Sequence, residues 1–228
     1  MTTAPKTSSK LDTLFSGNVT PVNATVANVS PVSVQSLNPL QLSFMQRSKC
    51  EGRLGVGFKR NSTVVENLYQ QGCAKIRLPK SYDQNAEAVM INSSGGITGG
   101  DALVWNFSAG AHSNLTITTQ ACERIYKSST LDVSKDSTSH KNSEAQGGSK
   151  TDLQYGKIDV CLNVGSHACL SWLPQETILF DRGALKRTLE IHLEKSSKAL
   201  ICESFILGRK EMDEVVESGY IKDKWRVY

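Results

Sequence analysis

Apolar and polar residues alternate with a period of two along most of the chain after about residue 43. In "LTITTQACERIY", Leu115 and Ile117 share one face of the segment, while Thr116 and Thr118 share the other. The segments "KIDVCLNV" and "TLEIHL" alternate in the same way. This alternation is typical of β-strands that bury one face and expose the other.

The strand-like segments recur at short intervals and are separated by Gly, Asn or Ser turns, as in "FKRNSTVV" and "NFSAGAHSN". The segment "GRKEMDEVVESG" differs, because Met212, Val215 and Val216 would share one side of a short helix. The sequence therefore predicts a mostly β fold of stacked antiparallel strands with one or two short helices.

Two stretches lack these patterns. Residues 1–42 are rich in Ser, Thr, Asn, Val and Pro and contain few large apolar groups, so burial cannot offset the entropy of ordering them. We predict a disordered N-terminal tail there. Residues 130–152 are rich in Ser and Lys and predict a mobile surface loop. The β domain is expected to span residues 43–228.

Composition narrows the class of protein. The 228 residues are 39% hydrophobic and 21% charged, and the net charge of +4 is too small to argue for nucleic acid binding. No apolar run approaches the roughly 20 residues of a membrane span, and the N-terminus lacks the apolar core of a signal peptide. The six cysteines form no C-x-x-C pair, so free thiols in a reducing cytoplasm are expected.

The stretch "NSSGGITGGD" holds four glycines just before Asp101. A phosphate-binding loop would need a lysine and then a Ser or Thr after the last glycine, but Asp101 and Ala102 occupy those places. A carboxylate there would repel phosphate. We therefore reject a nucleotide-binding interpretation of this loop.

Candidate chemistry is sparse. The four histidines are scattered, no firm metal site is predicted, and no nucleophile motif identifies a catalytic residue. Asp101 and Glu176 are the carboxylates that stand out. Glu176 lies between apolar residues in "WLPQETILF", where it either faces solvent by alternation or is partly buried and has a functional role. Asp101 either caps the glycine turn or faces the interior.

Five short motifs occur together between about Gly52 and the end of the chain. They are "LYQQGCAKIRLP", "SSGGITGGD", "TTQACERIYKS", "WLPQETILF" and "LGRKEMDE". In this order they resemble the urease accessory protein D family, called H in some organisms. The resemblance gives structural roles to the motif residues Gly95, Gly96, Gly99, Gly100, Thr119, Gln120, Trp172, Pro174, Gln175, Gly208 and Arg209.

The resemblance implies a cytoplasmic chaperone, not an enzyme, that helps to insert nickel into apo-urease. Family members bind the apo-urease subunits and accessory protein F, which recruits the GTPase accessory protein G. Nickel is expected only in transit through an internal water-filled passage, with no cofactor bound permanently. Asp101 and Glu176 are then the nickel-transit candidates, because weak oxygen ligands suit passage better than storage.

The chain also departs from the family pattern. Asp213 stands where many relatives have glycine, and the loop of residues 130–152 is expanded. Family members continue past "DKWRVY", so the resemblance implies a C-terminal truncation. Two other classes stay open: a β-rich hydrolase that uses Asp101 and Glu176 as an acid–base pair, and a β-sandwich binding module without a metal role.

Overall fold

A computed structural model describes residues 47–81, 84–128 and 154–228. The described residues all belong to one compact unit, Met45–Tyr228. The predicted N-terminal tail and the predicted mobile loop lie outside the described residues.

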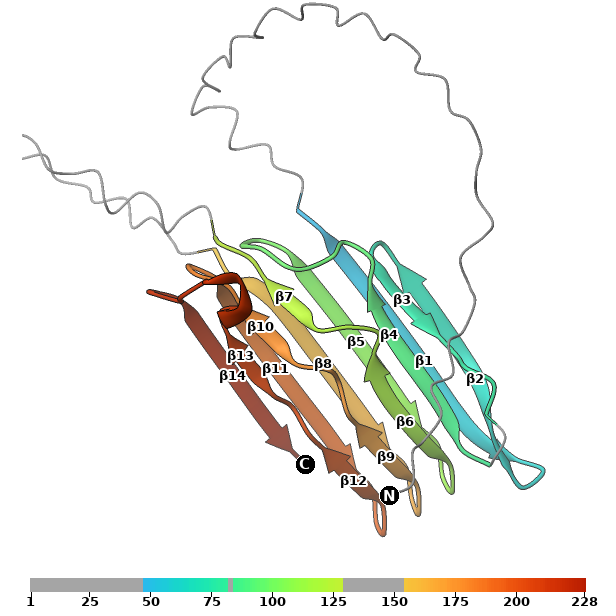
Figure 1. The fold of residues 1–228 in the computed structure, drawn as a ribbon. Helices are drawn as coiled ribbons and strands as arrows, with labels where there is room; N and C mark the ends of the chain where they lie inside the picture. The colour runs from blue at the N-terminus through green and yellow to red at the C-terminus, as the bar shows by residue number, and fades with distance from the viewer. Residues whose placement is uncertain (1–46, 82–83, 129–153) are drawn as a thin grey trace, which may run out of the picture. The chain divides into compact units, whose positions relative to one another are not determined.

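The described residues fold almost entirely into β-strands (Figure 1). In chain order the strands are β1 (Lys49–Lys59), β2 (Ser62–Gln71), β3 (Ala74–Arg77), β4 (Ala86–Asn92), β5 (Ala102–Ala109), β6 (Asn114–Thr119), β7 (Glu123–Ile125), β8 (Gly156–Val164), β9 (Cys169–Trp172), β10 (Thr177–Leu179), β11 (Ala184–Leu193), β12 (Lys198–Ile201), β13 (Phe205–Leu207) and β14 (Tyr220–Val227). The predicted mostly β class is confirmed.

The strands form three sheets that the chain visits in a fixed rotation. The first sheet has the order β14-β11-β8-β5-β1-β2, the second β12-β9-β6-β4-β3, and the third β13-β10-β7. From β5 onward the chain passes from the first sheet to the second and then to the third, and repeats this cycle (Figure 1). Each cycle is one coil, and β14 begins a fourth coil in the first sheet.

The prediction of antiparallel stacking is wrong for most of this fold. Only the β1–β2 and β3–β4 ladders are antiparallel. The other ladders between described strands are parallel. Alternation of apolar and polar residues indicates which face of a strand is buried, but it does not indicate whether the neighbouring strand is parallel or antiparallel. The short turns, which would join the strands of a hairpin in an antiparallel fold, lead to a strand in another sheet.

These short turns repeat from coil to coil. A four-residue turn follows each of β5, β8 and β11, and its third residue has a positive φ although it is not glycine. These residues are His112 (63°), His167 (57°) and Ser196 (62°). The His112 and His167 rings stack with centroids 5.1 Å apart. Equivalent positions on successive coils are therefore neighbours, although they are distant in sequence.

The predicted helix in "GRKEMDEVVESG" shortens to one turn of 3-10 helix, η3 (Lys210–Met212). Asp213 ends it with φ of 52°, in the left-handed region where glycine is favoured and where relatives were expected to have glycine. Met212 and Val215 are exposed, so no apolar surface supports a longer helix. No helix in the described ranges is long and apolar enough to span a membrane.

A disulfide joins Cys50 on β1 to Cys73 in the turn between β2 and β3, with Cα atoms 5.4 Å apart. The expectation of free thiols is wrong for this pair, because the β1–β2 hairpin brings together residues 23 positions apart. The expectation holds for Cys122, Cys161, Cys169 and Cys202.

Candidate functional site

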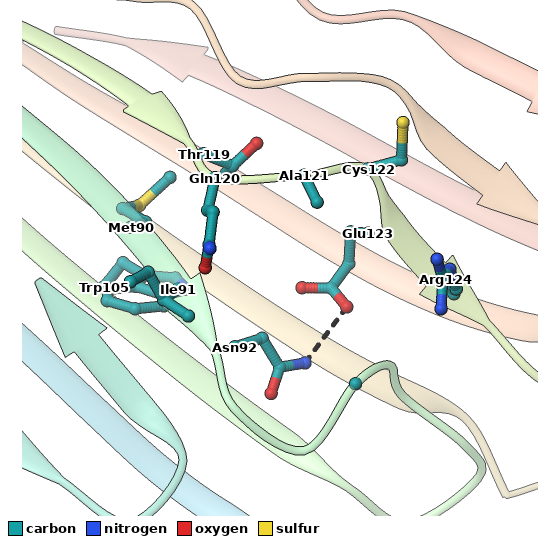
Figure 2. Close-up of a pocket in the computed structure, with 11 residues that line it drawn as sticks. Met90, Ile91, Asn92, Trp105, Thr119, Gln120, Ala121, Cys122, Glu123 and Arg124 are labelled. Carbon is teal, nitrogen blue, oxygen red and sulfur yellow. Dashed lines mark hydrogen bonds between the residues drawn. The ribbon is translucent and has the colours of Figure 1, made fainter. Parts of the chain in front are cut away.

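A polar pocket of about 140 Å³ lies where β4, β5 and β7 meet the end of β6 (Figure 2). Met90 and Asn92 come from β4 and Trp105 from β5, while Thr119 ends β6. Glu123, the first residue of β7, brings a carboxylate to this lining. The volume leaves room for a few water molecules.

Glu123 is the titratable group that this pocket perturbs most clearly. Its Oε1 accepts a hydrogen bond of 3.0 Å from Nδ2 of Asn92, and Figure 2 shows the two side chains directed toward each other. Burial raises the pKa of Glu123 to about 7, against the opposing effect of that hydrogen bond. The side chain can therefore gain or lose a proton near neutral pH.

Asn92 connects Glu123 to the glycine-rich turn. Its Nδ2 also donates to the carbonyl oxygen of Gly96 at 3.2 Å, while its Oδ1 accepts from the backbone N–H of Ser94 at 3.1 Å. One amide thus orients the Glu123 carboxylate and closes the turn.

A smaller cavity of about 40 Å³ also has Glu123 in its lining. It shares Met90, Trp105, Thr119 and Glu123 with the first pocket. Its other lining residues are Ile158, Val160, Trp172, Pro174, Gln175, Thr177, Arg187 and Glu203. Glu123 consequently belongs to the lining of both cavities.

Arg187 lines the smaller cavity and is almost fully buried. Its Nη2 lies 2.8 Å from Oε2 of Glu203 and 2.7 Å from Oδ2 of Asp223, and its Nη1 donates to Thr177 at 3.3 Å. Nε1 of Trp172 donates to the other Glu203 oxygen at 2.8 Å. Burial raises the pKa of Glu203 although the Arg187 guanidinium opposes this effect.

Asp101 is buried, and both of its carboxylate oxygens accept hydrogen bonds from backbone N–H groups. Oδ1 accepts from the N–H of Ser48 at 2.8 Å, and Oδ2 accepts from the N–H of Thr98 at 3.0 Å. This is the arrangement of a turn cap, one of the two roles considered for this residue. It leaves Asp101 poorly suited to act as a general acid or base.

The glycines before Asp101 are required by the backbone. Gly95, Gly96 and Gly100 have positive φ of 79°, 150° and 90°. A Cβ on Gly96 would lie 2.3 Å from the Tyr126 ring, and one on Gly99 would lie 2.5 Å from the carbonyl oxygen of Gln154. The turn therefore packs bare backbone against neighbouring segments.

Glu176 lies immediately before β10 and outside the lining of both cavities. Its Oε2 accepts from the Cys122 thiol at 3.3 Å, and its carbonyl oxygen accepts from the N–H of Glu123 at 3.0 Å. Its own backbone N–H, and secondly Cys122, keep the pKa of Glu176 below the usual range. Glu176 therefore borders the pocket through its backbone and presents an ionised carboxylate nearby.

The other motif residues support the pocket wall. Oγ1 of Thr119 accepts from the N–H of Gln175 at 2.9 Å, which fixes the end of β6 to the segment before β10. Gln120 lines the first pocket. Gly208 has φ of 70°, and the Arg209 guanidinium carbon lies 4.4 Å from the centre of the Phe180 ring.

The sequence motifs did not single out Glu123, Arg187 and Glu203, which line the cavities, or Asp223, which pairs with Arg187. Two of them carried a signal in the alternation. Arg187 lies in the inward phase of β11, between the buried Leu185 and Leu189, and Glu123 shares its face with the buried Ile125. A charge in the apolar phase of a strand indicates a buried polar group. No comparable signal pointed to Glu203.

These features define a β-coil protein with a partly buried pocket that contains an ionisable carboxyl group. Residues 49–228 match the model of the UreD urease accessory protein family. The chain belongs to this family, whose description is that of an accessory protein and not of an enzyme. The hydrolase hypothesis is therefore dropped.

Curated relatives agree with this assignment. The chain is 44% identical over 182 residues to the urease accessory protein UreD of Sinorhizobium medicae (strain WSM419), covering 80% of this chain and 57% of the relative. It is 42% identical to that of Rhizobium leguminosarum bv. viciae, with 80% and 58% covered. It is 40% identical to that of Chelativorans sp. (strain BNC1), with 81% and 58% covered. The chain thus spans less than two thirds of the length of these relatives.

Proposed function

We propose that this chain acts in urease maturation as a non-enzymatic chaperone that assists the insertion of Ni²⁺ into apo-urease. It does so in the cytoplasm, bound to the apo-urease subunits and to accessory protein F, with the GTPase accessory protein G joining through F. The observation that carries this proposal is family membership over residues 49–228.

The chemistry of the pocket supports nickel in transit as the cargo. Glu123 offers carboxylate oxygen atoms, which bind Ni²⁺ less firmly than imidazole or thiolate ligands and release it faster. Because the pKa of Glu123 is about 7, an arriving dication displaces a proton from the carboxyl group at modest cost. A protein that hands an ion onward needs such weak, reversible binding.

The same chemistry revises the choice of transit residues. We propose Glu123 and Glu203, which both line the smaller cavity, as the transit carboxylates. Glu176 stays a candidate, because its ionised carboxylate lies beside Cys122 at the edge of the pocket. Asp101 is the weaker candidate, because both its oxygens accept backbone hydrogen bonds.

Co-purification tests the function. Tagged chain expressed with the urease subunits and the accessory proteins should retain F and apo-urease through washing. Urease matured with the Glu123→Gln protein should hold several-fold less nickel by elemental analysis, while the variant still retains both partners. The matched control is Glu87→Gln on the exposed face of β4, which should support full nickel loading.

The outcomes separate the parts of the proposal. Recovery of neither partner would remove the assignment to urease maturation. Retained partners with full nickel loading by the Glu123→Gln protein would remove Glu123 from the transfer while leaving the chaperone role in place. Loss of partners on this substitution would give Glu123 a structural role.

A further inference from the structure

The outward face of the first sheet carries a row of lysines. Strands β8, β11 and β14 lie side by side in parallel (Figure 1). Lys186 on β11 is in register with Lys157 on β8 and with Lys222 on β14, and all three belong to the outward phase of their strands. Because neighbouring strands lie about 4.8 Å apart, three cations form one line across the sheet. We call these three residues the lysine row.

Two ion pairs account for the acidic residues of this face. On β8, β11 and β14 the outward acidic residues are Asp159 and Glu190. Nζ of Lys157 lies 2.7 Å from Oδ2 of Asp159, and Arg226 pairs with Glu190. Both carboxylates are therefore already engaged and do not balance the other lysines of the face.

Lys186, Lys222 and Lys224 are left without a carboxylate partner among the described side chains. Nζ of Lys186 lies 3.5 Å from the centre of the Tyr155 ring, a cation–π contact that leaves its charge in place. Lys222 and Lys224 are exposed. Like charges in register on neighbouring strands repel each other, so the lysine row does not stabilise the sheet by its charge. A fixed excess of positive charge favours an anionic partner.

A polar hollow of about 290 Å³ adjoins the lysine row. Its lining includes Thr188, two positions after Lys186 on the same face of β11, and Asp159, two positions after Lys157 on β8. Asn106 on β5 adds a side-chain amide. The hollow therefore offers neutral hydrogen-bonding groups beside a line of cations.

We propose that the lysine row and the hollow beside it bind an acidic peptide segment of a partner protein. Carboxylates of the segment pair with Lys186 and Lys222, and its backbone or polar side chains form hydrogen bonds with Thr188. The register of the sheet fixes the positions of the cations, so the match between the two charge patterns selects the partner.

A nucleic acid fits this face less well. Asp159 and Glu190 both line the hollow, where they oppose the continuous negative charge of a phosphate backbone. A peptide carries carboxylates only at some positions and can place neutral or donor groups against these two acids. The inference goes beyond the proposed function, because it requires neither nickel nor urease.

An octaglutamate peptide is the probe for this surface. It is titrated into the isotope-labelled 228-residue chain at about 50 mM salt, and the backbone amides are followed by NMR. The resonances that shift should concentrate in β8, β11 and β14. Raising the salt to about 200 mM should weaken binding several-fold, because exposed ion pairs are screened.

Neutral substitutions test the lysines directly. The combined variant Lys186→Gln, Lys222→Gln and Lys224→Gln should bind the peptide at least about fivefold more weakly, since each exposed ion pair contributes a factor of roughly 1.4 to 5. The matched control combines three other substitutions and should bind as the unsubstituted chain does. It removes the same charge from exposed positions on or beside the second sheet, by Lys75→Gln, Lys195→Gln and Lys198→Gln.

A stability measurement separates binding from folding. Lys222→Gln alone should leave the melting temperature unchanged or slightly higher, because it relieves repulsion from Lys186. A fall of more than about 5 °C would give the lysine row a structural role and overturn the inference.

Three other results would also overturn it. One is the absence of peptide binding at about 50 mM salt. Another is equal weakening by the two combined variants, because net charge alone would then explain the binding. The third is tighter binding of an eight-nucleotide thymidine oligomer than of octaglutamate at the same strands, because a nucleic acid would then be the occupant.

Discussion

Replacing Glu123 with Gln removes the group whose ionisation the pocket opposes most. The pKa of this carboxyl is raised from 4.5 to about 7 by burial. The ionised form is therefore disfavoured in the folded protein by about 3 kcal/mol, since each tenfold change in a protonation equilibrium corresponds to about 1.4 kcal/mol. Glutamine keeps the shape of the side chain and an oxygen that can accept from Asn92.

The direction in which stability changes with pH follows from the linkage between protonation and folding. Because the folded pKa lies above the unfolded one, the contribution of Glu123 to stability is fully present below about pH 4.5 and is lost as the pH rises toward 7. The Gln variant has no proton to lose at this position. Between pH 4.5 and 7.5 the free energy of unfolding should therefore shift in favour of the variant by about 3 kcal/mol relative to the unsubstituted chain.

Urea unfolding followed by tryptophan fluorescence measures this difference, because Trp105 lines the same pocket. Carboxyl carbon NMR measures the titration directly and should place the midpoint of Glu123 at about 7. Glu176→Gln is the control, because the pKa of Glu176 is lowered, so its contribution to stability changes mainly below about pH 4.5 and the difference for this variant should stay nearly constant over the same range. A Glu123→Gln difference that stays constant to within about 0.5 kcal/mol over this range would refute the reasoning.

Three further substitutions or treatments test the surrounding structure. Arg187→Met should destabilise the fold by about 3–5 kcal/mol in urea unfolding, because it leaves two carboxylates without their buried cation; a loss below about 1 kcal/mol would contradict the buried network. Reduction of the Cys50–Cys73 disulfide, which closes a loop of 23 positions, should lower the unfolding free energy by about 3.5 kcal/mol, and an unchanged melting temperature would count against the bond. Gly96→Ala should lower the melting temperature more than Gly95→Ala, because both glycines have positive φ but only the Cβ added at Gly96 would contact the Tyr126 ring. Equal effects of the two substitutions would argue against this close packing.

The fold class was predictable because alternation is a local property. Each strand with one buried face shows it, so "KIDVCLNV" and "TLEIHL" correctly predicted β8 and β11. Strand direction is not local. Whether β8 pairs with a parallel or an antiparallel neighbour depends on which strands the fold places beside it, and these are β5 and β11.

The candidate site was only partly predictable for the same reason. The sequence shows that Arg187 interrupts an apolar phase, which indicates a buried charge that needs a partner. One partner follows from register, because β14 lies beside β11 with Asp223 opposite Arg187. The other, Glu203, comes from the connection between β12 and β13. Asp101 drew attention through its glycines, yet those glycines shape the turn that Asp101 caps.

The coil also accounts for the electrostatic character of the site. Successive coils bring Glu123, Thr177 and Arg187 to one interior region, although up to 64 positions separate them in the chain. Arg187 supplies one positive charge against the two carboxylates of Glu203 and Asp223, so ionised forms of all three leave an excess of negative charge in this region. Glu123 adds a further negative charge as it loses its proton near pH 7. The burial that raises the pKa of Glu123 thereby makes the charge of this region sensitive to pH in the neutral range.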